Sequence, residues 1–142
     1  METEKLVELL GAENVSDAPE LLAAYAKDNS FAPAREPWSV VRPQSLEQVQ
    51  ALIQYASAAK APLIPVSSGM PRFRGDTVPV YGGIMVDMAG MNKIRMIDRK
   101  DRVAMIEPGV RFGQLQEALR KEGLRLPMPL CPRSTKSVIG SC

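Results

Sequence analysis

Residues 38–66, with the sequence WSVVRPQSLEQVQALIQYASAAKAPLIPV, decide the fold. Residues 39–42 form a short run that contains two valines, and residues 62–66 form a second apolar run; both are typical of strands. Between them, Ser45 is followed three residues later by Gln48, a capping box that predicts the start of a helix. A strand, a helix and a strand within about thirty residues make a βαβ unit, so the two strands are expected to be parallel neighbours.

The helix of this unit has apolar residues at helical spacing, at Val49, Leu52, Ile53 and Ala56. These four side chains are expected to face the sheet, and the helix is expected to end near Lys60.

Upstream of this unit, the sequence predicts two short helices, over residues 4–11 and 18–27, with Asp17 as the N-cap of the second. Residues 28–37 are rich in proline and turn formers and are expected to be an extended arm. The two predicted parts are a helical arm over residues 1–37 and a partial domain over residues 38–142.

Downstream, the sequence predicts three more strands and one helix. The strands are expected over residues 83–88, 94–98 and 102–107, with a tight turn over residues 98–101, and the helix over residues 112–122. The predicted fold class is therefore α+β: an N-terminal helical arm, then a βαβ unit and a small mixed sheet with flanking helices.

Composition excludes several classes of function. The net charge is +2, from 18 basic and 16 acidic residues, so no basic surface for nucleic acid is expected. There is no histidine, and the two cysteines, Cys131 and Cys142, cannot form a zinc site or an iron–sulfur cluster by themselves. No run approaches the roughly 18 apolar residues of a membrane span, and the first residues lack a signal peptide. We expect a cytoplasmic protein with free thiols.

The first candidate binding segment runs from Pro65 to Asp76 and leaves the carboxyl end of a predicted parallel strand, where ligands of α/β sheets bind. Ser67, Ser68 and Gly69 let backbone N–H groups converge on an anion, and two arginines, Arg72 and Arg74, add positive charge. A diphosphate matches such a loop. A surface turn with solvated arginines is the alternative.

The second candidate is the Glu107-Pro-Gly-Val turn before the helix whose N-terminus, near Phe112, could face an anion. Taken alone, this turn is better explained as a simple connection from a strand to a helix.

The third candidate is the segment Pro132-Arg-Ser-Thr-Lys-Ser-Val-Ile-Gly-Ser-Cys142. This segment could form hydrogen bonds with a phosphate or a ribityl chain. The donors would be the hydroxyls of Ser134, Thr135 and Ser137 and the backbone amides of Gly140 and Ser141. A polar, frayed end of the chain is the alternative.

The order of these segments resembles the FAD-binding domain of the vanillyl-alcohol oxidase family, in particular its glycolate oxidase and D-lactate dehydrogenase branch. The resemblance begins at Trp38 and covers the rest of the chain. Its runs are Val40–Val49, Pro65–Pro79, Gly82–Asn92, Val103–Val110, Gly113–Leu115 and Ile139–Gly140.

The resemblance implies that the chain binds FAD, and without a histidine the flavin is expected to be non-covalent. The parent activity it implies is oxidation of a 2-hydroxy acid such as glycolate or D-lactate, with hydride transfer to the flavin. No residue here is expected to be catalytic, and this chain alone is not expected to be active. The predicted cofactor-binding residues are Val66, Ser67, Ser68, Gly69, Met70, Pro108, Gly109, Arg133, Ser134, Thr135, Gly140 and Ser141.

The sequence departs from the family pattern in two ways, and the second suggests that another part of the protein or a partner subunit completes the domain. The loop has Ser67-Ser68-Gly69 where the family has consecutive glycines, and the family's domain continues past Gly140. We expect the remainder of the enzyme or a partner subunit to complete the domain, and a homo-oligomer is possible. The alternative is a non-catalytic subunit or vestigial module that keeps the fold for assembly or electron transfer in a larger complex.

Overall fold

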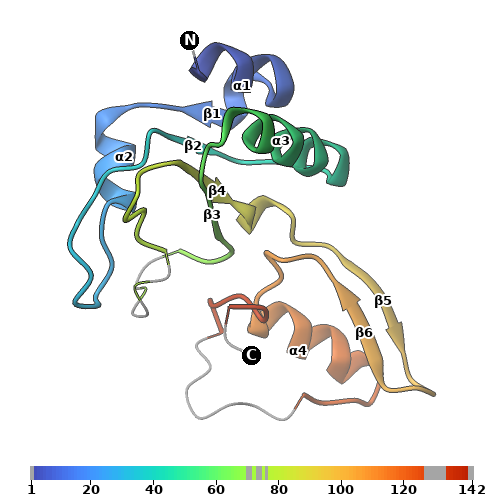
Figure 1. The fold of residues 1–142 in the computed structure, drawn as a ribbon. Helices are drawn as coiled ribbons and strands as arrows, with labels where there is room; N and C mark the ends of the chain where they lie inside the picture. Colours follow the sequence, from blue (N-terminus) through green and yellow to red (C-terminus); the bar gives the residue numbers. More distant parts are fainter. Residues whose placement is uncertain (1, 70–71, 73–74, 76, 127–133, 141–142) are drawn as a thin grey trace.

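The computed structural model describes residues 2–69, 72, 75, 77–126 and 134–140 (Figure 1). It has the α+β fold predicted, in two sheets with four α-helices. The elements are α1 (Glu2–Leu10), η1 (Ala12–Asn14), β1 (Val15–Ser16), α2 (Pro19–Tyr25), β2 (Ser39–Val41), α3 (Leu46–Ala59), β3 (Leu63–Val66), β4 (Ile84–Asp87), η2 (Met88–Gly90), β5 (Ile94–Asp98), β6 (Val103–Ile106) and α4 (Phe112–Lys121).

The larger sheet has the strand order β1-β2-β4-β3. Strands β2 and β3 are parallel, as predicted, but both pair with β4, so the prediction that they are neighbours is wrong. The composition of the strands explains the order. The run Ile84-Met85-Val86 is buried throughout and suits the centre of a sheet, whereas Pro65 in β3 cannot donate a ladder hydrogen bond and suits an edge.

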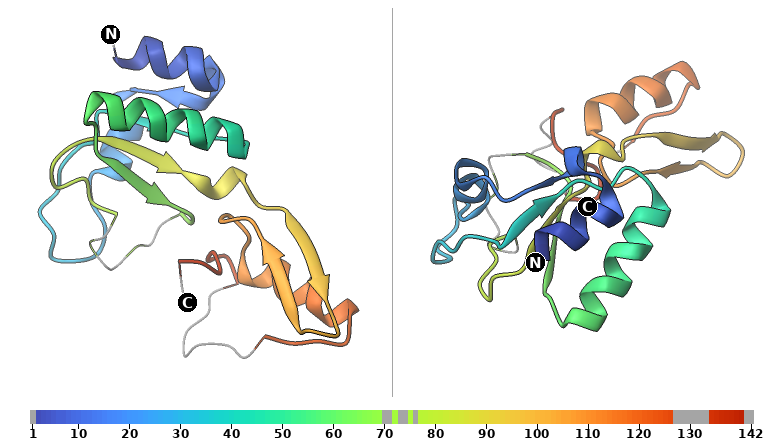
Figure 2. Two further views of the ribbon diagram at one scale, coloured as in Figure 1. Left: turned by 45° about the vertical axis from the view of Figure 1, so that its right-hand side comes forward. Right: turned by 90° about the horizontal axis from the view of Figure 1, so that it is seen from above.

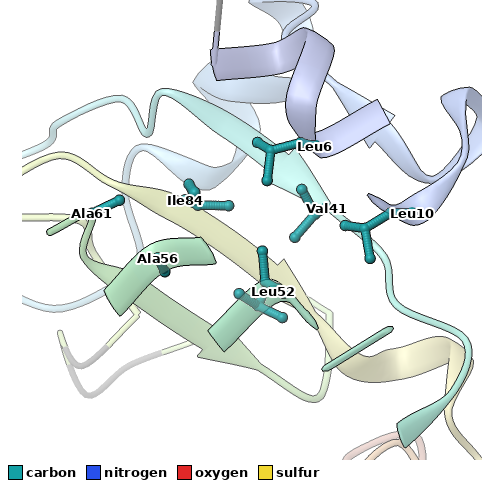
Figure 3. Close-up of a cluster of buried hydrophobic side chains, with 8 residues drawn as sticks. Leu6, Leu10, Val41, Leu52, Ala56, Ala61 and Ile84 are labelled. Atoms are coloured by element: carbon teal, nitrogen blue, oxygen red, sulfur yellow. The ribbon is translucent and has the colours of Figure 1, made fainter. Parts of the chain in front are cut away.

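One face of this sheet carries the main core. Helices α1 and α3 cover it, and Figure 3 shows Leu52 and Ala56 of α3 facing Val41 and Ile84 of the strands. The whole cluster comprises Leu6, Leu10, Val41, Leu52, Ala56, Ala61, Ile84 and Val86. The N-terminal arm therefore contributes to the same core as the βαβ unit.

Helix α2 covers the opposite face of the sheet. Val40, Val66 and Met85 are buried there, and Leu21 and Tyr25 of α2 pack against them. Because side chains alternate along a strand, Val40 and Val41 point to opposite faces, and both faces are covered by helices.

Helix α3 begins at the predicted cap. The Ser45 Oγ accepts from the Gln48 N–H at 3.3 Å, but the Gln48 Oε1 accepts from the Gln44 N–H at 2.7 Å, one residue before the position expected for a capping box. Ile53 was expected to face the sheet, but it is 53% exposed; the buried residues of α3 are Leu52 and Ala56.

Helix α2 does not begin as predicted. Its N-cap is Ala18, with no side-chain hydrogen bond, and Pro19 occupies the first turn. Asp17 instead accepts a hydrogen bond from the Thr3 hydroxyl at 3.2 Å, so it ties α2 to α1.

The second sheet is the antiparallel hairpin of β5 and β6, with α4 packed on one of its faces (Figure 2). Its turn is tight, as predicted, because the Asp98 Oδ1 accepts from the N–H groups of Lys100 at 2.8 Å and Asp101 at 3.0 Å. In the part of the chain that the structure describes, no helix is both long and apolar enough to cross a membrane.

Candidate functional site

Two of the predicted binding segments meet, although 70 residues separate them. The Ser67 Oγ and the Ser137 Oγ lie 2.6 Å apart and share a hydrogen bond. Beside this contact, the Lys136 Nζ donates to the Gly69 carbonyl at 2.5 Å. The loop after β3 and the segment over residues 134–140 therefore form one surface (Figure 1).

Gly140 packs against Ser67 and Ser137. Its N–H donates to the Ser137 Oγ at 3.1 Å. A Cβ on Gly140 would lie 2.8 Å from that oxygen and 3.3 Å from the Ser67 Oγ, so only glycine fits without displacing a hydroxyl. We call Ser67, Ser68, Ser137 and Gly140 the hydroxyl cluster.

Gly69 differs from Gly140 because no described residue fills the space beside it. A Cβ built on Gly69 would meet no atom of the described residues within 4 Å. Ser67, Ser68 and Gly69 all keep φ outside the left-handed region, so serine can stand in this loop without backbone strain. The Ser68 hydroxyl has no hydrogen-bond partner among the described residues, which leaves it available to a ligand.

The ends of secondary-structure elements position both segments. Val66, the last residue of β3, is buried and pairs with Asp87, so the loop leaves the carboxyl end of the sheet. The other segment runs antiparallel to the entry of α4: the Val138 N–H donates to the Val110 carbonyl at 2.9 Å, and the Phe112 N–H donates to the Lys136 carbonyl at 2.9 Å.

The same pairing corrects the expectation that the N-terminus of α4 faces an anion. The Phe112 N–H is used by the Lys136 carbonyl, and the Gly113 N–H donates to the Ser134 carbonyl at 3.0 Å. Two of the first amides of the helix are therefore satisfied by the chain itself and are not directed at a ligand.

Gly109 has a packing function in the structure. Its N–H donates to the Met91 carbonyl at 2.7 Å, and a Cβ on it would lie 2.6 Å from the Ala89 carbonyl oxygen. Pro108 beside it is partly buried. The close approach explains why glycine stands here, and a contact of Pro108 or Gly109 with a cofactor stays a prediction.

Glu107, the first residue of this turn, is also used structurally. Its Oε2 accepts from the Lys93 N–H at 2.7 Å, and its Oε1 pairs with Arg95. The Lys93 amide, followed by the Arg95 guanidinium, lowers the pKa of the Glu107 carboxyl, which favours its charged form. The carboxylate joins the ends of β5 and β6.

Arg72 is buried, so the alternative of a solvated side chain is wrong for this residue. It is 9% exposed, and its guanidinium lies over the ring of Tyr25, 4.9 Å from the centroid. A second positive group, which the sequence reasoning did not name, lies at the loop: the Lys136 Nζ donates to the Gly69 carbonyl. The expectation that Arg72 adds positive charge to a bound anion stays a prediction.

The structure thus joins Ser67, Ser68, Gly69 and Gly140 of the predicted cofactor residues. Ser134 and Thr135 lie exposed on the adjoining turn, and Met70, Arg133 and Ser141 lie outside the described residues. Sequence reasoning missed Lys136 and left Ser137 out of the set. The only signal for them was their place among hydroxyl residues in Ser-Thr-Lys-Ser.

Comparison with known protein families identifies residues 37–141 as an FAD binding domain. The chain is 36% identical over 122 residues to D-2-hydroxyglutarate dehydrogenase of Stutzerimonas stutzeri, covering 84% of this chain and 26% of that protein. It is 27% identical over 124 residues to a glycolate oxidase subunit of Bacillus subtilis, covering 87% of this chain and 26% of that subunit.

Among solved structures, p-cresol methylhydroxylase with substrate bound has a similar fold, with a TM-score of 0.80 and 30% sequence identity. The similarity covers 94% of this chain and 26% of that one. The chain therefore spans about a quarter of the length of the relatives it matches.

Proposed function

Because this chain belongs to the FAD binding domain family of flavin oxidoreductases, we propose that the hydroxyl cluster and Gly69 hold the diphosphate of FAD. The observation that carries the proposal is the contact of Ser67 with Ser137 at 2.6 Å beside the open space at Gly69. Two segments expected to bind one cofactor meet there, and space remains for it.

The residues fit a diphosphate chemically. Ser68 offers a hydroxyl that has no hydrogen-bond partner among the described residues, and Gly69 permits close approach to the backbone. Lys136 places an ammonium group at the Gly69 carbonyl, where it balances the negative charge of a phosphate. Ser67 and Ser137 hold the two segments together and fix the distance between them.

We propose that the protein containing this chain oxidises a 2-hydroxy acid, by analogy with its D-2-hydroxyglutarate dehydrogenase and glycolate oxidase relatives. The bound flavin would supply the hydride acceptor. This chain's residues bind and orient the cofactor, and the rest of the protein or a partner subunit would supply the substrate site. A cytoplasmic location and a possible homo-oligomer remain predictions.

Cofactor titration tests the proposal. The complete protein, stripped of flavin, should bind FAD with absorbance near roughly 450 nm and should release it on denaturation, since no histidine can tether it here. ADP should compete with FAD, and riboflavin, which lacks the diphosphate, should bind more weakly. Riboflavin binding as tightly as FAD would contradict a diphosphate site at the hydroxyl cluster.

A 4-alkylphenol is the second candidate substrate, because p-cresol methylhydroxylase is also similar to this chain. Mixing the FAD-loaded protein without oxygen with D-2-hydroxyglutarate, glycolate, D-lactate or p-cresol distinguishes the two classes. We expect the hydroxy acids to bleach the flavin absorbance. Bleaching by p-cresol alone would assign the protein to the second class.

A further inference from the structure

A network of contacts ties helix α2 to the loop that follows β3. The Arg72 Cζ lies 4.9 Å from the centroid of the Tyr25 ring, within the range of a cation–π interaction. The Arg72 Nη2 also donates to the Ala24 carbonyl at 3.4 Å. Because the Arg72 side chain is buried, water does not weaken this contact as it would at the surface.

Two hydrogen bonds from the turn after α2 hold the same loop. The Asn29 N–H donates to the Arg72 carbonyl at 2.7 Å, and the Gly75 N–H donates to the Asp28 Oδ2 at 2.7 Å. Gly75 has a φ of +76°, and a Cβ there would lie 3.1 Å from the Ser30 Oγ. The two backbones approach closely, and the loop is held at two points three residues apart.

Helix α2 is itself fixed to the carboxyl end of the sheet. The Tyr25 hydroxyl donates to the Asp87 Oδ2 at 2.8 Å, and the Arg42 Nε donates to the same oxygen at 3.3 Å. Burial, with the neighbouring Asp87 charge, raises the pKa of Tyr25, so the phenol keeps the proton that it donates. The contacts thus run from the end of β4 through Tyr25 to Arg72.

We propose that these contacts position the FAD-binding loop and that Tyr25 and Arg72 are positioning residues of the cofactor site. We call the set the clasp: Tyr25, Asp28 and Asn29 on one side, Arg72 and Gly75 on the other. The inference rests on the proposed function. It extends the site to residues that precede the matched FAD binding domain, residues 37–141.

The physical reason is the short distance along the chain between the clasp and the binding residues. The loop leaves β3 at Val66, and Arg72 follows Gly69 by three residues. Ser68 and Gly69 lie between two points that contacts fix, the end of β3 at Val66 and the clasp at Arg72, and this favours the position in which they meet the diphosphate. Loss of the clasp contacts lowers the fraction of molecules whose loop is in the FAD-binding conformation. The apparent Kd for FAD then rises by the same factor.

The alternative is that the clasp stabilises only the N-terminal arm. In that case its loss would lower thermal stability and leave the affinity for FAD unchanged in the protein that remains folded. The two interpretations therefore predict different values for the Kd of FAD in clasp variants that remain folded.

The experiment measures Kd for FAD, ADP and riboflavin in the complete protein with Tyr25→Leu or Arg72→Met. We expect each variant to bind FAD and ADP roughly 3- to 30-fold more weakly and riboflavin unchanged, because only the diphosphate contacts the loop. Tyr25→Phe keeps the ring under Arg72 and should regain most of the affinity. Unchanged FAD and ADP affinity in folded Tyr25→Leu would overturn the proposal.

Matched controls are Tyr81→Leu and Arg99→Met, two exposed residues outside the clasp, which should bind all three ligands like wild type. If wild-type protein binds no FAD, the proposed function fails. If wild type binds FAD and the clasp variants do so equally well, only the clasp fails.

A measurement on wild-type protein covers the case in which the variants do not fold. Coupling is reciprocal, so FAD must strengthen the clasp if the clasp strengthens FAD binding. We expect hydrogen exchange at the Asn29 and Gly75 amides to slow when FAD is added, whereas the Lys100 amide of the β5–β6 turn keeps its rate. Unchanged exchange at Asn29 and Gly75 with saturating FAD would overturn the inference.

Discussion

At the scale of the residue, Gly69 and Gly109 are both turn glycines, but their surroundings differ. A Cβ at Gly109 would lie 2.6 Å from the Ala89 carbonyl oxygen and 2.7 Å from the Met88 carbonyl oxygen. A Cβ at Gly69 would meet no atom within 4 Å in the part of the chain that the structure describes. The same substitution at the two positions should therefore have different effects on stability.

Gly109→Ala should lower the free energy of unfolding by about 1–3 kcal/mol, the usual cost of forcing an extra group into a packed site. Gly69→Ala is the matched control and should stay within about 0.5 kcal/mol of wild type. Urea unfolding of the FAD-free proteins measures both. Equal midpoints for Gly109→Ala and wild type would refute the packing function of Gly109.

Asp28 makes the stability of the clasp depend on pH. Partial burial would raise the pKa of its carboxyl, but hydrogen bonds from Ser30 and Gly75 and the charge of Arg72 outweigh burial and lower it. The charged carboxylate therefore stabilises the fold above its unfolded pKa of about 3.9, and this contribution is lost as pH falls through the folded pKa.

Comparison with Asp28→Asn isolates this effect. The difference in unfolding free energy between wild type and the variant should shrink as pH is lowered from about 6 to about 3. A difference that stays constant over that range would mean that ionisation of Asp28 does not stabilise the clasp.

Ser67, Ser68 and Gly69 were proposed as ligand residues from local sequence, because small and polar residues follow a strand. The structure places Ser67 beside Ser137, and the contact of these residues with FAD stays a prediction. The positions of Lys136 and Arg72 could not be predicted, because they depend on partners far along the chain, at Gly69 and Tyr25. A single sequence carries no signal for such pairs.

At the scale of the element, the N-terminus of α3 depends on one hydroxyl. Ser45→Ala removes the acceptor of the Gln48 N–H and should cost about 0.5–2 kcal/mol of stability. Ser57→Ala, at an exposed site in the same helix, is the control and should be neutral or slightly stabilising. Urea unfolding distinguishes the two, and equal effects would rule out Ser45 as a significant cap.

The strand order illustrates the limit of local patterns. The βαβ unit correctly predicted that β2 and β3 are parallel, because a helical crossover requires it. The insertion of β4 between them depends on a strand that comes later in the chain. Pro65 was the available cue, since a proline that cannot donate belongs at a sheet edge.

At the scale of the whole molecule, the β5–β6 hairpin has one face without cover among the described residues. Helix α4 packs against Ile97 and Ala104, whereas Met96, Val103 and Met105 are exposed at 45%, 52% and 58%. Exposed apolar side chains on a two-stranded sheet favour association with another surface.

The 142-residue chain on its own should therefore self-associate, and Met96→Lys with Met105→Lys should reduce this association. Gln50→Lys with Gln54→Lys, two exposed positions of α3, adds the same charge away from the hairpin and serves as the control. Light scattering at micromolar concentrations measures the mass. A monomeric wild-type chain would contradict the expectation.

The segment over residues 134–140 joins the two sheets of the molecule. Val138 packs in the core of the hairpin and α4, and Ser137 beside it contacts Ser67 at the end of the larger sheet. The proposed FAD site lies at this junction, so we expect cofactor binding to depend on the relative position of the two sheets.

The measurement that tests this account most directly is the FAD content of Gly69→Val in the complete protein. Among the described residues, no atom lies within 4 Å of a Cβ at this position, so thermal unfolding of the FAD-free variant should stay within about 2 °C of wild type. Its branched side chain would occupy the space proposed for the diphosphate, and FAD content should fall at least about tenfold, a loss of roughly 1.4 kcal/mol or more in binding. A folded Gly69→Val protein with full FAD content would contradict the account, because the diphosphate would then have to bind elsewhere.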